Sequence, residues 1–306
     1  MLRNRSATLL LTALAPAVWG STYLVTTELL PPGRPLLAAV LRALPAGLLL
    51  LLVTRKLPTG SWWWKSLVLG ALNIGVFFAL LFVAAYRLPG GVAATVGSVQ
   101  PLLVAGLSAV LLGRRLTPAV LVAGVTGIAG VALLVLRADA RLDALGVAAA
   151  LGGAVVMATG VVLSKRWTSP ASLLATTGWQ LVAGGLLLLP VALFVEGPPP
   201  AELTARNLLG YGYLSTVGAA LAYTLWFRGI KALSPTEVTF LGLLSPLVAA
   251  VLGWIALDQG LSGLQLLGGL LALTAVVLAQ TGGSRSRPAA TVPDRRGPAT
   301  RRTPVR

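Results

Sequence analysis

The segment Leu36–Leu51, LLAAVLRALPAGLLLL, is followed 138 residues later by a related one, Leu174–Leu189, LATTGWQLVAGGLLLL. Gly47 coincides with Gly185, the terminal leucine runs coincide, and Arg42 in the first copy corresponds to Gln180 in the second. A helix rises 1.5 Å per residue, so about 20 apolar residues cross the roughly 30 Å of hydrocarbon in a bilayer. Each copy therefore predicts a transmembrane helix, and the pair predicts a chain of two homologous halves.

The composition of the whole chain agrees with a membrane protein. Of its 306 residues, 56% are hydrophobic and only 10% are charged, whereas roughly a quarter of the residues in a soluble domain are charged. The apolar runs are too long for the alternating strands of a barrel, so helices are expected. The predicted spans are Leu9 to Thr27, Pro35 to Val53, Trp64 to Ala85, Val92 to Leu112, Pro118 to Leu136, Leu145 to Leu163, Leu173 to Phe194, Leu208 to Phe227, Thr236 to Leu257 and Leu264 to Ala279.

A second alignment of the two halves, together with the number of spans in each, predicts how the halves are related by symmetry. A shift of 145 residues places Val99–Leu103 over Leu244–Val248 and aligns Pro101 with Pro246. Five spans in each half make the second copy enter the membrane from the opposite side, as in the inverted repeats of secondary transporters. The predicted fold class is an all-α membrane protein with ten transmembrane helices as two inverted five-helix repeats, residues 1–140 and 141–281.

The basic residues predict the orientation, because cytoplasmic loops are rich in Lys and Arg. Of the 24 Lys and Arg residues, 18 fall on the side that holds both termini and five on the other. Both termini are therefore expected in the cytoplasm of a multi-pass cell membrane protein. Residues 282–306, which are rich in Arg, Pro and Ser, are expected to form a disordered basic cytoplasmic tail. The tail lacks the aromatic side chains that stack on bases, so anionic lipid is a better partner for it than nucleic acid.

Two residue types that are common in catalytic and metal sites are absent from the sequence. The chain has no cysteine and no histidine, which removes thiol nucleophiles, imidazole bases and nearly all zinc ligands. No paired aspartates fall within a span. We therefore expect neither an enzyme, nor a metal site, nor a cofactor.

Several motifs resemble the drug/metabolite transporter superfamily, specifically its EamA-domain family. They are Trp19-Gly20-Ser21-Thr22, Arg42, Val99-Gln100-Pro101-Leu102, Leu111 to Thr117, Gly124 to Gly130, Tyr223 to Gly229, Leu244-Ser245-Pro246-Leu247 and Gly268-Gly269. Each motif is loose, but together they extend in order from about residue 8 to residue 281. The resemblance implies a ten-helix transporter.

Arg42 is the first candidate for a binding site, since a charge near the middle of a bilayer costs roughly 2.5 to 3.5 kcal/mol on insertion scales. It could pair with a carboxylate of the solute or with Glu28. Equally, it could extend toward the headgroups or bond helix carbonyls.

The other candidates are polar or aromatic residues within spans. Gln100 and Gln180 can bind a solute or a neighbouring helix, and Asn73 is more typical of helix contacts. Trp19, Tyr23, Trp179 and Tyr223 could line a cavity and stack a solute, or pack. Pro101 and Pro246 are expected to kink their helices at matching places, which suits alternating access, although membrane helices also tolerate proline.

The resulting functional hypothesis is a secondary transporter that exports small metabolites, amino acids or drugs by alternating access. A channel or a non-transporting membrane scaffold remains the alternative. The expected partners are a small solute and the lipid bilayer, and the expected state is a monomer or a weak homodimer.

Overall fold

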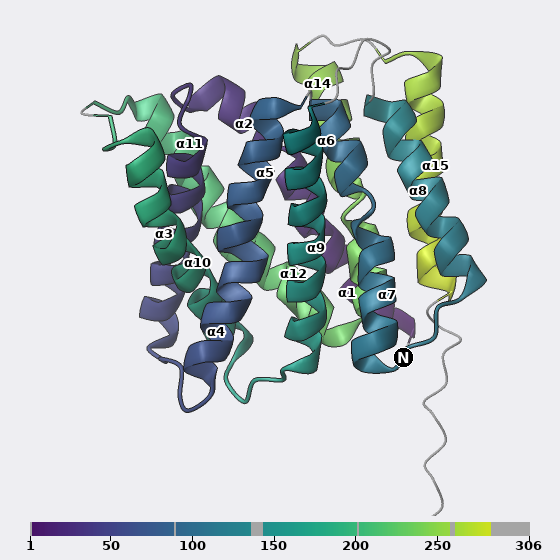
Figure 1. Cartoon of the computed structure of the whole chain (residues 1–306), viewed down its shortest axis with the longest axis horizontal. Coiled ribbons are helices and arrows are strands. Elements are labelled where there is room, and N and C mark those ends of the chain that lie inside the picture. Colours follow the sequence, from purple (N-terminus) through teal and green to yellow (C-terminus); the bar gives the residue numbers. More distant parts are fainter. Residues whose placement is uncertain (1, 89, 136–142, 201, 258–260, 283–306) are drawn as a thin grey trace, which may run out of the picture.

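The structure, a computed structural model, describes residues 2–88, 90–135, 143–200, 202–257 and 261–282. All regular elements in these ranges are helices, and they form one bundle (Figure 1). In chain order they are α1 (Leu2–Gly20), α2 (Thr22–Leu29), α3 (Pro35–Thr54), α4 (Trp62–Gly70), the π-helix η1 (Ala71–Gly75), α5 (Val76–Arg87), α6 (Gly90–Gly97), α7 (Gln100–Leu112), α8 (Pro118–Val135), α9 (Ala144–Arg166), α10 (Leu173–Glu196), α11 (Ala205–Ser215), the π-helix η2 (Thr216–Leu221), α12 (Ala222–Ala232), α13 (Pro235–Leu241), α14 (Leu244–Leu257) and α15 (Gly263–Gly282).

Nine helices in the described ranges are long and apolar enough to cross a membrane. They correspond to nine of the ten predicted spans. The predicted span Leu208 to Phe227 is not among them, although α11, η2 and α12 form an unbroken helical run there. Its Tyr211, Ser215, Tyr223 and Trp226 are buried against other helices, so this run does not need the apolar composition of a lipid-facing helix.

Two of the predicted spans are broken about one helical turn before a proline. α6 ends at Gly97, four residues before Pro101, and α13 ends one residue before Gly242, which lies four residues before Pro246. Proline has no amide proton to bond the carbonyl four residues earlier, and its ring clashes with that carbonyl. Each of these spans is therefore two helices joined by a turn.

Close glycine contacts hold the helix pairs together. On α8 and α15, a methyl group on Gly130 would lie 2.5 Å from the amide nitrogen of Ala272, and one on Gly268 would lie 2.6 Å from the carbonyl oxygen of Gly130. On α10, a methyl group on Gly184 would lie 2.6 Å from Cβ of Ile74. Small residues let membrane helices approach until their backbones touch, and these pairs depend on that approach.

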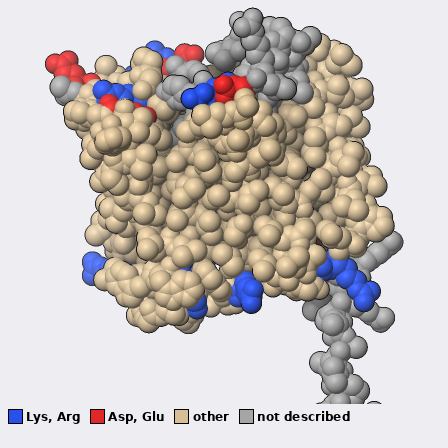
Figure 2. All heavy atoms as spheres, in the orientation of Figure 1, with Lys and Arg blue, Asp and Glu red and all other residues tan. Residues whose placement is uncertain are grey.

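On the face shown in Figure 2 the charged residues lie at the two ends of the bundle. Between them is a band of uncharged residues, and because many large apolar side chains of the bundle are exposed, we call it the apolar band. In this view the lower end shows only Lys and Arg among the described residues, and the upper end shows both signs. We call the lower end, where the α3–α4 and α7–α8 links lie with the start of α1, the basic end (Figure 1). The other is called the opposite end. The predicted tail 282–306 lies outside the described residues, apart from Gly282 at the end of α15.

Each end of the bundle has its own ion pairs. At the basic end, Arg5 Nη2 donates to Glu237 Oε1 at 2.6 Å and to the Gln280 carbonyl at 2.8 Å, which connects α1, α13 and α15. At the opposite end, Arg206 lies 3.6 Å from Glu28. Glu28 thus pairs with Arg206, and Arg42 has different neighbours.

Candidate functional site

Arg42 lies inside the bundle, seven residues after the first residue of α3, or about 11 Å along the helix. Its Nη2 donates to the carbonyl oxygen of Gly218 at 3.0 Å. Its guanidinium carbon lies 5.5 Å from the ring centroid of Phe78. A carbonyl dipole and an aromatic face both stabilise a cation that has lost its water. The half-buried guanidinium is therefore accommodated by the protein within the apolar band.

The Gly218 carbonyl is linked through Trp19 to a group of aromatic side chains. It also accepts a hydrogen bond from Trp19 Nε1 at 3.1 Å. The Trp19 ring lies 5.0 Å from the ring of Tyr223 and 5.1 Å from that of Trp226. We call Trp19, Arg42, Phe78, Gly218 and Tyr223 the arginine cluster.

The accepting carbonyl lies in a π-helix. Gly218 lies in η2, and a π-turn widens the helix by one residue and disturbs the regular backbone bonds, often at functional sites. The carbonyl can then accept side-chain donors from α1 and α3.

A second polar group lies on η1. Asn73 Nδ2 donates to Gln180 Oε1 at 2.9 Å and to Ser164 Oγ at 3.2 Å. Gln180 Nε2 in turn bonds the carbonyl of Thr176 at 3.3 Å. Asn73 is fully buried, and among the described residues its Oδ1 has no hydrogen-bond partner. We call Asn73, Ser164 and Gln180 the amide cluster.

The two clusters occupy related places in the sequence. Gly218 follows Asn73 by 145 residues, and Gln180 follows Arg42 by 138, the two shifts that align the halves of the chain. In one cluster a residue of α3 bonds η2, and in the other a residue of α10 bonds η1. Both clusters therefore combine a π-helix with the helix that carries the quoted repeat.

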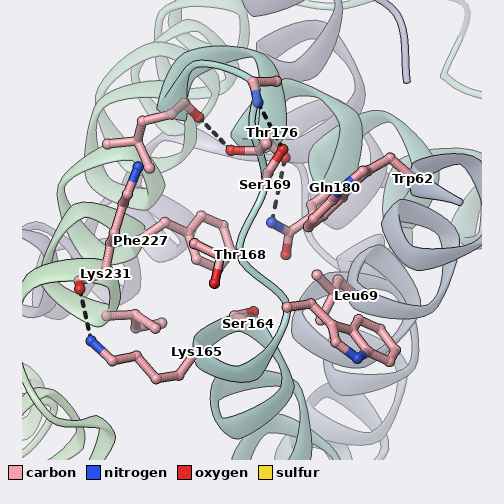
Figure 3. A pocket seen from close by; sticks show the side chains of 14 residues that line it. Trp62, Leu69, Ser164, Lys165, Thr168, Ser169, Thr176, Gln180, Phe227 and Lys231 are labelled. Carbon is pink, nitrogen blue, oxygen red and sulfur yellow. Dashed lines mark hydrogen bonds between the residues drawn. The ribbon is translucent and has the colours of Figure 1, made fainter. Parts of the chain in front are cut away.

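A cavity of about 230 Å³ adjoins the amide cluster and lies toward the basic end. Figure 3 shows Gln180, Ser164, Phe227 and Lys165 around the same hollow. The full lining is Trp62, Leu69, Ser164, Lys165, Trp167, Thr168, Ser169, Ala171, Leu173, Thr176, Gln180, Phe227, Ile230 and Lys231. It comes from α4, α9, the link after α9, α10 and α12.

Two aromatic rings of α12 connect this cavity to the arginine cluster. Phe227 lines the cavity, while Tyr223 contacts Trp19, and the centroids of the Tyr223 and Phe227 rings lie 5.8 Å apart. Both side chains are buried. We call this pair the aromatic partition.

The remaining predicted site residues lie elsewhere or have no described contact. Trp179 Nε1 donates to the carbonyl of Lys56 at 2.7 Å, and its ring packs against Trp62, so it anchors the α3–α4 link. Gln100 is half-buried at the start of α7 and makes no side-chain hydrogen bond within the described part of the chain. The side chain of Tyr23 lies outside the described residues.

Some residues of the site had no obvious signal in the sequence. Phe78, Lys165 and Phe227 read as ordinary apolar or loop-end residues, and Gly218 contributes only its backbone. The repeat could have indicated Gly218, because the 145-residue shift pairs it with Asn73.

Comparison with known proteins identifies the family. The sequence signature described as the EamA-like transporter family matches residues 6–136 and again residues 144–281. The chain belongs to the EamA-like transporter family. Protein PecM of Dickeya dadantii (strain 3937) is 51% identical over 268 residues, which cover 87% of this chain and 90% of PecM.

One further relative and one solved structure are also similar to this chain. The inner membrane transporter YedA of Escherichia coli (strain K12) is 30% identical over 271 residues, covering 87% of this chain and 88% of YedA. A crystal structure of a protein with 22% sequence identity superposes with a TM-score of 0.77 over 92% of this chain and 98% of that one. This EamA-like chain is therefore a multi-pass membrane protein of a transporter family, with a fold already seen in a crystal.

Proposed function

We propose that this chain is a secondary transporter that exports a small organic solute by alternating access, with ten spans in two inverted repeats, residues 1–140 and 141–281. The observation that carries the proposal is the matched pair of clusters on η1 and η2. Alternating access needs two half-sites that exchange roles as the repeats move about a central site. The arginine cluster and the amide cluster have that relation in sequence.

Other features support the two-repeat organisation. The breaks before Pro101 and Pro246 fall at equivalent positions. The run α11–η2–α12 supplies the tenth span, because it is 28 residues from Ala205 to Ala232, long enough for about 30 Å of hydrocarbon. An even number of spans agrees with the charge distribution.

The solute class follows from the arginine cluster. Among the charged residues that the structure describes, Arg42 lies farthest from the ends of its helix, and its fork of donors suits a carboxylate or a similar planar anion. We propose an anionic or zwitterionic metabolite, amino acid or drug, with Trp19 and Tyr223 as the aromatic walls. Asn73, Gln100 and Gln180 are proposed as further polar contacts.

Counterflow in proteoliposomes is the direct test of a carrier. Vesicles loaded with a candidate unlabelled solute should take up the labelled solute above its equilibrium level, and the rate should saturate, because a carrier binds one solute per cycle. A channel instead gives flux that follows the gradient without counterflow. A scaffold gives no flux above protein-free vesicles, so either result contradicts the proposal.

The proposed orientation places the basic end in the cytoplasm. Since the chain has no cysteine, a thiol reagent can label only a cysteine introduced by substitution. Labelling then shows on which side of the membrane that position lies. In intact cells, a membrane-impermeant thiol reagent should label Glu202→Cys, at the opposite end, but not Thr59→Cys, in the α3–α4 link. Permeabilised cells provide the control that both cysteines react. Labelling of position 59 alone in intact cells would reverse the orientation.

A further inference from the structure

The cavity at the basic end contains positive charge that is separate from the arginine cluster. Its 14 lining residues include two lysines, several hydroxyls and no carboxylate. Small-solute sites usually combine apolar walls with a few placed polar groups. This cavity has apolar walls from Trp62 and Phe227 and a polar side from Thr176, Gln180 and Lys165.

Lys165 is the best-placed cation in this cavity. Its Nζ donates to the carbonyl oxygens of Lys231 at 2.7 Å and Leu233 at 2.9 Å, which fixes the ammonium group at the end of α12. An ammonium has three protons to donate, so one more can be donated. Among the described residues, no carboxylate forms an ion pair with Lys165, because the nearby Glu237 is bonded to Arg5.

The shape of the cavity limits its ligand. About 230 Å³ is below the roughly 300 to 1,000 Å³ of drug-sized sites, so the ligand is small. Phe227 and Trp62 contribute aromatic rings to the lining, which suits an aromatic or other planar body. Gln180 and the hydroxyl of Ser164 lie at the wall shared with the amide cluster.

We infer that this cavity is a cytosol-facing loading site for small organic carboxylates, in which Lys165 binds the carboxylate and Phe227 and Trp62 contact the planar body. The inference rests on the proposed transport function and deepens it by giving the solute a first binding site. The solute reaches Arg42 only after Tyr223 and Phe227 separate. Two cations on either side of the aromatic partition then give the path two successive anion sites.

Thiol labelling tests the site without any transport measurement. Thr176→Cys places a thiol in the cavity, and Thr59→Cys places one at the same end outside it. Each variant, in inside-out membrane vesicles, is treated with anionic sulfonatoethyl methanethiosulfonate and with cationic trimethylammonioethyl methanethiosulfonate. The anionic-to-cationic rate ratio at position 176 should exceed that at position 59 by about fivefold, because a nearby cation concentrates anions in a partly dehydrated space.

Substitution of Lys165 identifies the source of the preference. In the Thr176→Cys background, Lys165→Gln should bring the ratio down to that of position 59, whereas Lys165→Arg should keep it. A ratio at position 176 equal to that at position 59, or one unchanged by Lys165→Gln, overturns the inference.

Ligand protection decides the point even if Lys165→Gln does not fold. Benzoate should slow labelling of Thr176→Cys at least threefold more than equimolar benzamide, its neutral analogue of similar shape, and neither should affect Thr59→Cys. Equal protection by the two overturns the inference. Labelling needs no transport cycle, so a protein that fails the counterflow test can still give the expected labelling. Failure of the proposed transport function and failure of the proposed loading site can therefore be distinguished.

Discussion

Replacing Arg42 with glutamine is expected to lower saturable transport per molecule at least tenfold while leaving the amount of folded protein in the membrane close to that of the parent. A hydrogen bond to a charged group is worth roughly 1.5 to 3 kcal/mol, and each 1.4 kcal/mol is about tenfold in affinity. Glutamine ends short of the position of Nη2 and gives up the hydrogen bond to the Gly218 carbonyl, but it also removes a charge that is costly within a span, so the folded protein should be retained. Transport in proteoliposomes, normalised to the amount of purified protein, measures the effect.

Two matched variants separate charge from general damage. Arg42→Lys keeps the positive charge but loses the planar fork, and it should retain part of the transport. Arg228→Gln removes an exposed cation of α12 and should behave as the parent. If Arg42→Gln transports at the parental rate per molecule, Arg42 is not in the site and the preference for anions has to be dropped.

Gly130→Ala is expected to destabilise the protein by about 1 to 3 kcal/mol, the usual cost of overpacking a close contact. The added methyl group would lie 2.5 Å from the Ala272 amide nitrogen and 2.8 Å from the Gly268 carbonyl oxygen. Backbone atoms cannot rotate away as a side chain can, so α8 and α15 must separate. The measurement is the midpoint of thermal unfolding in detergent.

Gly106→Ala is the matched control for that experiment. Gly106 lies within α7, and a methyl group there would meet nothing within 4 Å. Alanine also has the higher helix propensity. The midpoint of Gly106→Ala should therefore equal or exceed that of the parent, and an equal fall in both variants would mean that the α8–α15 contact is not responsible.

Length and hydropathy predicted most helices of the fold, because a bilayer imposes the same length on every span. They did not predict where a span is interrupted by a π-helix. Asn73 of η1 and Gly218 of η2 bond residues of other helices, and such contacts cannot be predicted from the sequence of one helix. The breaks before Pro101 and Pro246 could be placed approximately, since the effect of proline is local.

The candidate site was predictable only in part. Arg42, Asn73, Gln180 and Tyr223 are unusual in apolar runs, so the sequence drew attention to them. Trp179 looked equally suitable, yet its indole donates to the Lys56 carbonyl. A tryptophan in a span can line a cavity, pack against another helix or anchor a link, and its role depends on the segments that it contacts.

The bonds that Arg5 makes with Glu237 and with the Gln280 carbonyl also set an order of events in biosynthesis. These partners lie 232 and 275 residues further along the chain. At roughly 5 to 20 residues per second, the ribosome needs between about 14 and 55 s to reach Gln280 after making Arg5. The first helix must therefore wait in the membrane without its final partners until the last helix emerges, and truncation of the last helix would leave it permanently in that early state.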